Sequence, residues 1–158
     1  MANTQSMCTS FMGELMTATH NFGVSPIRAA STADTFKAAL YLVSATINAS
    51  TTAYTVSGEV SGAGYSAGGI AVTNATPPTA TNASATAGVA FFTPSASLVY
   101  TSVTLTTAFD AVLIYNSTQS DKAVSVHTFG SQTITAGTFT LTMPTNNTTD
   151  ALLRLATT

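Results

Sequence analysis

The stretch Phe109–Phe129, FDAVLIYNSTQSDKAVSVHTF, decides the fold. Residues 109–116 of this stretch form a largely apolar run, and residues 122–129 are rich in β-branched and aromatic side chains. Between the two runs lie the polar residues 117–121, STQSD, which have the composition of a turn. Two strand-forming runs joined by so short a turn predict an antiparallel β-hairpin.

Further strands are predicted on both sides of this hairpin, because apolar and polar residues alternate there with a period of two. The alternation is clearest in residues 36–43 and in residues 138–143. Shorter strands are predicted at residues 53–60, 69–73, 89–92, 98–105 and 133–135. Many short strands separated by turn signals indicate a mainly β chain, and specifically an antiparallel, jelly-roll-like β-sandwich.

Two other segments of the chain are predicted to lie outside the main run of strands. Residues 74–88, NATPPTATNASATAG, have low complexity and are predicted to be a loop, because Pro77-Pro78 cannot join a strand ladder. Residues 151–155 are predicted to be a short C-terminal edge strand or docking tail.

One α-helix is predicted, over residues 3–20. Apolar side chains recur there at helical spacing and form a single stripe, which comprises Met7, Cys8, Phe11, Met12, Leu15 and Met16. The helix either packs on its own sheet or docks on a neighbouring subunit. In the second case the interface candidates are Met7, Phe11, Met12, Leu15 and Met16. The chain is therefore expected to be a single domain with a helical arm, residues 1–25, and a β-sandwich, residues 26–158.

The composition of the chain excludes several functional classes. Charged residues make up 6% of the 158 residues, whereas 32 are Thr and 17 are Ser, and the net charge is −2. Without a basic run, a nucleic-acid binder is not expected, and no apolar stretch is long enough for a membrane helix. The absence of a secretory signal and the single cysteine, Cys8, favour synthesis in a reducing cytoplasm.

The residues of one catalytic pattern are present, but their context is not. Residues 64–68, GYSAG, match the G-x-S-x-G nucleophile elbow around Ser66, and Asp110 or Asp121 and then His127 follow in hydrolase order. The elbow requires a strand before it and a helix after it, whereas the flanks here are a glycine-rich loop and a short strand. Residues 62–67 match a loose dinucleotide fingerprint, again without the required helix.

No metal, cofactor or catalytic residue is predicted. The only histidines, His20 and His127, stand far apart in the sequence, and no carboxylate pair has ligand spacing, apart from the weak pattern of Asp121 near His127. We expect His127 to be a hydrogen-bonded packing residue on a strand and Cys8 to be a buried thiol. The protein is therefore not expected to be an enzyme. Its weakly charged surface favours self-association as a dimer or trimer.

Three stretches carry a resemblance to a known family. Residues 34–69, DTFKAALYLVSATINASTTAYTVSGEVSGAGYSAGG, and residues 109–144, FDAVLIYNSTQSDKAVSVHTFGSQTITAGTFTLTMP, resemble small tailed-bacteriophage virion proteins encoded near the head genes. The opening residues 1–23, MANTQSMCTSFMGELMTATHNFG, are similar to the N-terminal helix of that family. The resemblance covers most of the chain, leaves residues 74–88 as its variable part, and supplies no catalytic residues.

This resemblance implies a structural virion protein, and first a capsid cement or decoration protein. Such a protein is made in the cytoplasm of the bacterial host, lies on the capsid surface and bridges subunits of the major capsid protein. One alternative is a head-to-tail connector or tail component, whose partners are other virion subunits. A further alternative is a host-surface carbohydrate-binding module, although the chain has no Trp and only five Tyr to form a sugar platform.

Overall fold

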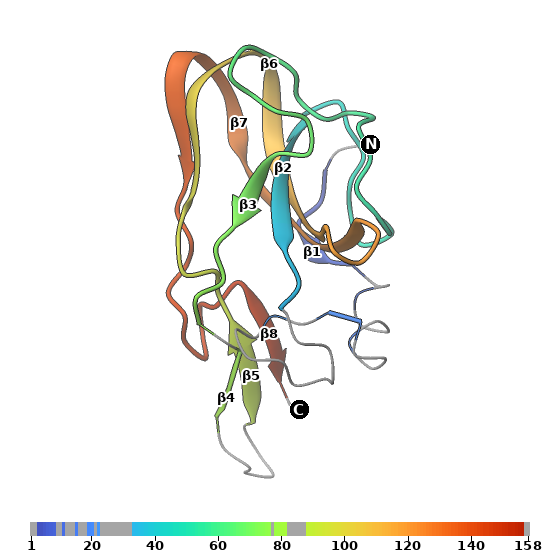
Figure 1. The fold of residues 1–158 in the computed structure, drawn as a ribbon, viewed down its shortest axis with the longest axis vertical. Coiled ribbons are helices and arrows are strands. Elements are labelled where there is room, and N and C mark those ends of the chain that lie inside the picture. Colours follow the sequence, from blue (N-terminus) through green and yellow to red (C-terminus); the bar gives the residue numbers. More distant parts are fainter. Residues whose placement is uncertain are drawn as a thin grey trace. The chain divides into compact units, whose positions relative to one another are not determined.

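The computed structural model of this protein is mainly β (Figure 1). It describes residues 3–8, 11, 15, 19–20, 22, 33–76, 78–81 and 88–156. The strands among these residues form two antiparallel sheets, one of five strands and one of three. The mainly β class and the antiparallel pairing predicted from the sequence are therefore confirmed.

The five-stranded sheet has the order β1-β7-β6-β2-β3. Its strands are β1 (Ser6–Met7), β2 (Phe36–Leu42), β3 (Ile70–Val72), β6 (Leu98–Asn116) and β7 (Lys122–Leu141). β6 and β7 are adjacent, and the predicted turn at residues 117–121 joins them. β2 lies on the other side of β6, with Ala38 opposite Ile114. The predicted hairpin is thus confirmed, and it forms the centre of the sheet.

β6 and β7 are far longer than the strands predicted from the sequence. β6 has 19 residues and β7 has 20, because the polar residues between the predicted short strands remain extended instead of forming turns. Thr106, Thr107 and Thr138 belong to this extended backbone, which their branched β-carbons favour. Two residues with positive φ, Ser102 at 54° and Ala136 at 47°, locally distort the strands without ending them.

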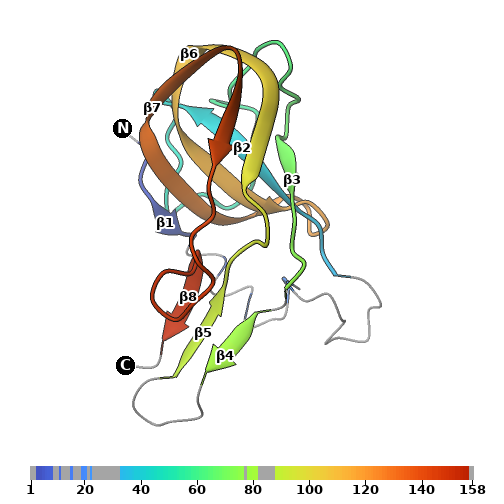
Figure 2. The same cartoon turned by 90° about the vertical axis from the view of Figure 1, so that its left-hand side faces the viewer.

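The β6–β7 hairpin curves back on itself (Figure 2). The rings of Phe129 and Phe139 lie ten residues apart in β7, yet their centroids are only 5.2 Å apart. A straight strand would separate them by roughly 33 Å. Both rings also pack against Phe109 of β6, at 5.9 and 5.1 Å. This aromatic cluster fills the inside of the curved hairpin.

The three-stranded sheet consists of β4 (Thr79–Thr81), β5 (Val89–Phe92) and β8 (Leu153–Ala156), in the order β4-β5-β8. β5 is the central strand, and its Phe91 and Phe92 are buried. β8 confirms the predicted C-terminal edge strand. The prediction that all of residues 74–88 form a loop is wrong at β4, because the Thr residues directly after Pro78 pair with β5 at the sheet edge.

The chain is organised as two compact units. The first comprises residues 1–20, 34–72 and 98–140, and the second comprises residues 21–33, 73–97 and 141–158. The five-stranded sheet belongs to the first unit, and the three-stranded sheet belongs to the second. The expected division into an arm, residues 1–25, and a β-sandwich, residues 26–158, stays a prediction.

The predicted helix over residues 3–20 is not supported. Residues 6–7 form β1, in which Ser6 lies opposite Val126 of β7, so the predicted start of the helix is wrong. Phe11 and Leu15 have helical backbone, but most of their neighbours lie outside the described residues. Helical spacing of apolar residues does not reveal that the backbone of residues 6–8 is needed to pair with a sheet edge.

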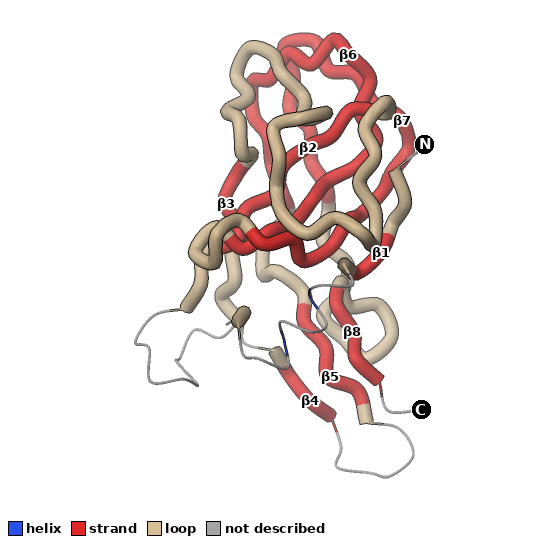
Figure 3. The backbone as a smooth tube through the Cα atoms, turned by 90° about the vertical axis from the view of Figure 1, so that its right-hand side faces the viewer, coloured by secondary structure: helices blue, strands red, loops and turns tan. Residues whose placement is uncertain are grey.

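The predicted strand at residues 53–60 is also wrong. This part of the chain belongs to the long connection between β2 and β3, drawn in tan in Figure 3. Its backbone pairs with the sheet only through isolated bridges, such as Ala53 with Lys122 and Glu59 with Tyr41. Gly58, with a φ of 80°, turns the chain within the segment and ends any extended run.

Gly69 provides a test of how tightly this connection is seated on β2. Its φ is 71°, and a Cβ atom there would overlap the carbonyl oxygen of Ala38. We expect Gly69→Ala to lower the free energy of unfolding by more than about 2 kcal/mol, because backbone strain and a backbone clash combine.

The matched control for this substitution is Gly130→Ala. Gly130 has no neighbouring atom within 4 Å of a built Cβ, so the substitution is expected to change stability by well under 1 kcal/mol. Urea unfolding of both variants measures the difference. Equal effects of the two substitutions would contradict the close contact between Gly69 and β2.

Candidate functional site

The candidate interface residues lie in the N-terminal segment, and the structure describes three of the five. Met7 and Leu15 are half-buried, whereas Phe11 is only 2% exposed and packs against His20 with ring centroids 4.8 Å apart. Met12 and Met16 lie outside the described residues. In a single chain Phe11 is therefore the least accessible of the three. That these residues contact a neighbouring subunit stays a prediction.

Asn3 attaches the start of this segment to the first unit. Its side-chain amide nitrogen donates hydrogen bonds to the carbonyl oxygen of Leu42 at 3.1 Å and to Oδ1 of Asp110 at 2.6 Å. Its amide oxygen accepts a hydrogen bond from the backbone N–H of Ile47 at 3.1 Å. The backbone N–H of Thr4 donates to the carbonyl of Ile47 in addition. These bonds fix the path of the chain before β1.

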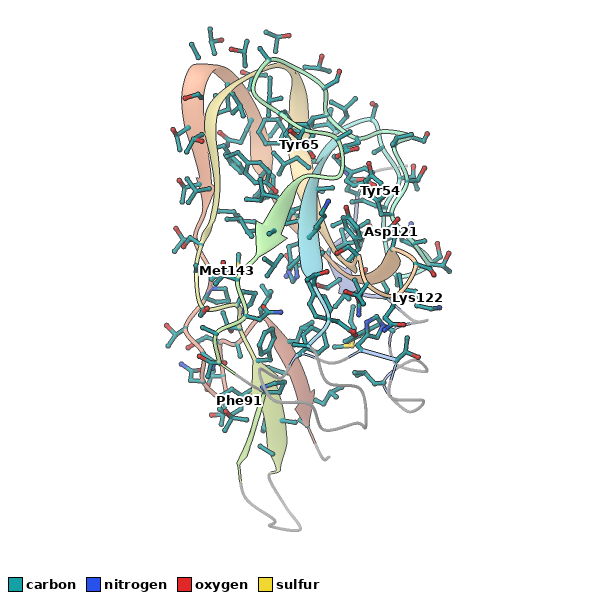
Figure 4. The ribbon with its side chains drawn as sticks, viewed as in Figure 1. Tyr54, Tyr65, Phe91, Asp121, Lys122 and Met143 are labelled. Carbon is teal, nitrogen blue, oxygen red and sulfur yellow. The ribbon has the colours of Figure 1, made fainter. Side chains whose placement is uncertain are left out.

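The polar centre of the first unit is the carboxylate of Glu59, which is only 9% exposed. Its Oε2 accepts a hydrogen bond from the hydroxyl of Tyr54 at 2.6 Å. Its Oε1 accepts hydrogen bonds from the hydroxyl of Tyr65 at 2.7 Å and from the backbone N–H of Gly68 at 2.8 Å. Tyr54 and Tyr65 come from the connection between β2 and β3 and are labelled in Figure 4. The buried charge thus receives three donors from its own connection.

The other three tyrosines surround this carboxylate from the sheet. Tyr115 stacks on Tyr54 with centroids 4.7 Å apart, and Tyr100 stacks on Tyr65 at 5.9 Å. The hydroxyls of Tyr115 and Tyr100 donate to the backbone carbonyls of Gly68 and Ala38. The hydroxyl of Tyr41 donates to the carbonyl of Thr55. All five tyrosines of the chain therefore belong to one network, which we call the Glu59 cluster: Tyr41, Tyr54, Glu59, Tyr65, Tyr100 and Tyr115.

The electrostatics of the Glu59 cluster keep its tyrosines protonated. Burial, and then the nearby charges of Asp121 and Glu59, raise the pKa of Tyr115 to about 12. Burial, with a smaller contribution from Glu59, also raises the pKa of Tyr41 to about 12. Burial and hydrogen bonding to Glu59 raise the pKa of Tyr65 as well. The hydroxyls act as hydrogen-bond donors, so the cluster is suited to holding structure rather than to proton transfer.

Sequence reasoning did not identify the Glu59 cluster. Its members are scattered from residue 41 to residue 115 and have no recognisable spacing. The available signal was the single acidic residue, Glu59, in a glycine-rich and otherwise uncharged stretch. A lone carboxylate among apolar and glycine residues must find donors elsewhere in the fold.

Ser66 does not lie on a nucleophile elbow. Residues 63–69 around it consist of turns and an isolated bridge, and the short strand β3 follows at Ile70. The backbone carbonyl of Ser66 accepts a hydrogen bond from the N–H of Gly69, which closes a tight turn. The strand and helix that the hydrolase pattern requires are therefore replaced here by turn and strand.

A second polar cluster contains His20. The side-chain oxygen of Asn116 accepts hydrogen bonds from the backbone N–H groups of Thr118 and Gln119, so the orientation of its amide is fixed. Its Nδ2 then donates to Nδ1 of His20 at 3.0 Å and to Oδ2 of Asp34 at 2.8 Å. Because Nδ1 of His20 is an acceptor, the ring is neutral with its proton on Nε2. Asn116 joins the N-terminal segment to the end of β6.

His127 lies on β7 as a hydrogen-bonded side chain, in the environment expected from the sequence. Its Nε2 lies 2.9 Å from Oγ of the buried Ser125. Burial lowers the pKa of His127 to about 4, so the imidazole is neutral at physiological pH. The pair has no described carboxylate partner, and a base with so low a pKa would be a weak activator of a serine.

The described part of the chain contains no group of three or more His, Cys, Asp or Glu side chains that could hold a metal ion. Within the same residues, no helix is long and apolar enough to cross a membrane. No protein-family model, no curated protein and no solved structure matches this chain.

The hydrogen bond from Tyr65 to Glu59 is expected to stabilise the fold. Tyr65→Phe removes a donor from a buried carboxylate, which should lower the free energy of unfolding by about 1.5–3 kcal/mol. Tyr100→Phe is the matched control, because it removes the same group, a hydroxyl, but one that donates to a neutral backbone carbonyl. The expected cost is about 0.5–1.5 kcal/mol. Urea unfolding measures both. A larger cost for Tyr100→Phe would contradict the central role of Glu59.

His127 is expected to make the protein sensitive to acid. The pKa of His127 is about 4 in the folded protein and about 6.5 in the unfolded chain. The stability that the neutral imidazole contributes is therefore complete above pH 6.5 and is lost as the pH falls toward 4. The loss amounts to at most about 3 kcal/mol. His127→Asn keeps a polar partner for Ser125 but cannot take up this proton. Urea unfolding at pH 7 and pH 4.5 should therefore show a smaller acid loss in the variant than in the wild type.

Proposed function

We propose that this protein is a non-enzymatic structural subunit of a tailed-bacteriophage virion. In this proposal it acts as a capsid cement protein that binds the assembled shell and bridges neighbouring major-capsid subunits. The proposal includes the jelly-roll-like β-sandwich expected from the sequence, which the mainly β, antiparallel structure supports. The resemblance of residues 34–69 and 109–144 to small virion proteins supplies the virion context.

The observation that carries the proposal is the uncharged exterior of the β6–β7 hairpin. Between Leu98 and Leu141 the only charged residues are Asp110, Asp121 and Lys122, and all three are half-buried. The exposed residues of this range are Val99, Thr101, Ser102, Thr106, Thr107, Thr118, Ser120, Gly130, Ser131, Gln132, Thr133, Thr135, Ala136, Thr138 and Thr140. Hydroxyl and small apolar groups can contact a protein surface without the desolvation cost of burying charges.

The interior of the first unit supports a mechanical role. The carboxylate of Glu59 accepts three hydrogen bonds from its own chain, and the pKa values of the surrounding tyrosines are raised, so the cluster holds its protons. The long hairpin is packed on an aromatic cluster of Phe109, Phe129 and Phe139. Such an interior resists deformation, which a protein that reinforces a shell requires.

The sugar-binding alternative gains no support from the aromatic residues. Every Phe and Tyr of the chain is among the described residues, and none of them is exposed. Carbohydrate platforms require exposed aromatic faces, whereas these rings are buried or half-buried.

We expect particles assembled without this protein to rupture at lower temperature or weaker osmotic stress than particles that contain it. A protein that binds only the assembled shell stabilises it by mass action, and the effect grows with the number of copies. Adding the purified protein back to the deficient particles should restore their resistance. Particle integrity is measured by release of DNA during a temperature ramp.

The number of copies in each virion separates the cement proposal from the connector alternative. A cement protein is expected at hundreds of copies, whereas a connector is expected at about six or twelve, as the ring symmetry of an oligomer dictates. Deficient heads of full strength that fail to attach a tail would contradict the cement role and favour the connector.

A further inference from the structure

The outer edge of β7, on the side away from β6, is covered at its beginning by another part of the same chain. β1 covers it there, with Met7 opposite Ser125 and Ser6 opposite Val126. This edge therefore accepts strands, and it does so by antiparallel backbone pairing.

The cover ends abruptly after Val126. The chain before β1 does not continue along β7, because Asn3 is bonded to Leu42, Asp110 and Ile47 instead. From His127 to Leu141, no other described segment pairs with the outer edge of β7, while β6 occupies its inner edge. Figure 2 shows β7 at the outside of the sheet, with β1 beside its first part only.

The direction of the backbone groups along this edge follows from the pairing with β1. The carbonyl of Val124 accepts a hydrogen bond from the N–H of Cys8, so it faces outward. N–H and C=O groups of every second residue face the same edge. The alternation continues to Thr128, Gly130, Gln132 and Ile134, before the distortion at Ala136. These four residues offer outward donors and acceptors over a stretch of roughly 20 Å. The carbonyl of Gly130 also accepts a hydrogen bond from the side-chain amide of Gln132.

The exposed edge lacks the devices that usually prevent strands from pairing. Residues 127–135, HTFGSQTIT, contain no Lys, Arg, Asp, Glu or Pro. Natural proteins commonly protect edge strands with charges, prolines or a covering segment. The distortion at Ala136 limits the open stretch at its far end but does not protect residues 127–135.

We propose that residues 127–135 of β7 pair with the same residues of a second copy of this chain, antiparallel about a two-fold axis at Ser131. The outward residues are arranged symmetrically about this position, so Thr128 meets Ile134 and Gly130 meets Gln132 of the second copy. Each such pair exchanges two hydrogen bonds, which gives about eight in total. Ser131 lies opposite its own copy.

A second copy fits this edge better than a charged partner does. Neither edge carries a charge, so self-pairing buries no unpaired ion and brings no like charges together. Hydroxyl side chains opposite one another, such as the two Ser131 residues, form favourable cross-strand pairs. This edge is a surface of the protein itself, and its pairing does not depend on the proposed place of the protein in a virion.

Charge substitutions at the two-fold axis test this pairing. Ser131 is exposed, so Ser131→Lys and Ser131→Glu are expected to leave the fold intact. Each variant places two like charges opposite one another and should weaken self-association at least about tenfold. An equimolar mixture of the two variants should recover association as a mixed dimer. Sedimentation equilibrium at 5–100 µM (about the range in which weak edge pairing is measurable) gives the dissociation constants.

The control is Thr107→Lys, which adds the same charge to an exposed Thr on β6, an interior strand of the sheet. It should leave the wild-type dissociation constant unchanged. If either Ser131 variant loses its β circular dichroism, Gln132→Pro replaces it, because that substitution removes an outward N–H group together with the side-chain amide that bonds the carbonyl of Gly130. A strictly monomeric wild type overturns the proposal. So does a dimer that Ser131→Lys and Ser131→Glu leave intact.

Discussion

The buried carboxylate of Glu59 is the constraint on which the first unit depends. A charge removed from water must be matched by donors, and here the chain supplies Tyr54, Tyr65 and the N–H of Gly68. All three donors belong to the connection between β2 and β3. The connection has no extended ladder of its own, so its path is fixed by satisfying one carboxylate rather than by strand pairing.

The same constraint explains the glycines of the connection. Tyr65 can reach both Glu59 and the N–H of Leu40 only if residues 62–69 lie directly on the sheet backbone. A Cβ atom at Gly62 would overlap the carbonyl oxygen of Thr104, and one at Gly69 would overlap that of Ala38. The glycine-rich pattern that resembles a catalytic or nucleotide-binding loop is therefore accounted for by close packing of backbone on backbone.

The sequence contained enough information to predict the elements that form locally. The hairpin around residues 117–121, the strand at 36–42 and the strand at 89–92 follow from period-two patterning and turn composition, and the structure contains each of them. The helical spacing in residues 3–20 gave a wrong prediction for residues 6–7. These residues form β1, which is short, and its pairing with β7 is set by the distant contacts of Asn3. The Glu59 cluster could not be predicted, since its members meet only after the sheet has formed.

The hydrogen bonds of Asn3 connect the internal architecture to the surface. By diverting the chain toward Leu42 and Ile47, they limit β1 to two residues and leave the backbone of β7 after Val126 without a described partner strand. A longer β1 would have covered the outward groups of Thr128 and Gly130. Residues 127–135 of β7 carry no charged side chain, so this edge has no charge that would keep another strand from pairing with it. One side-chain amide thus determines where the sheet stops being covered by its own chain and where another strand can be added.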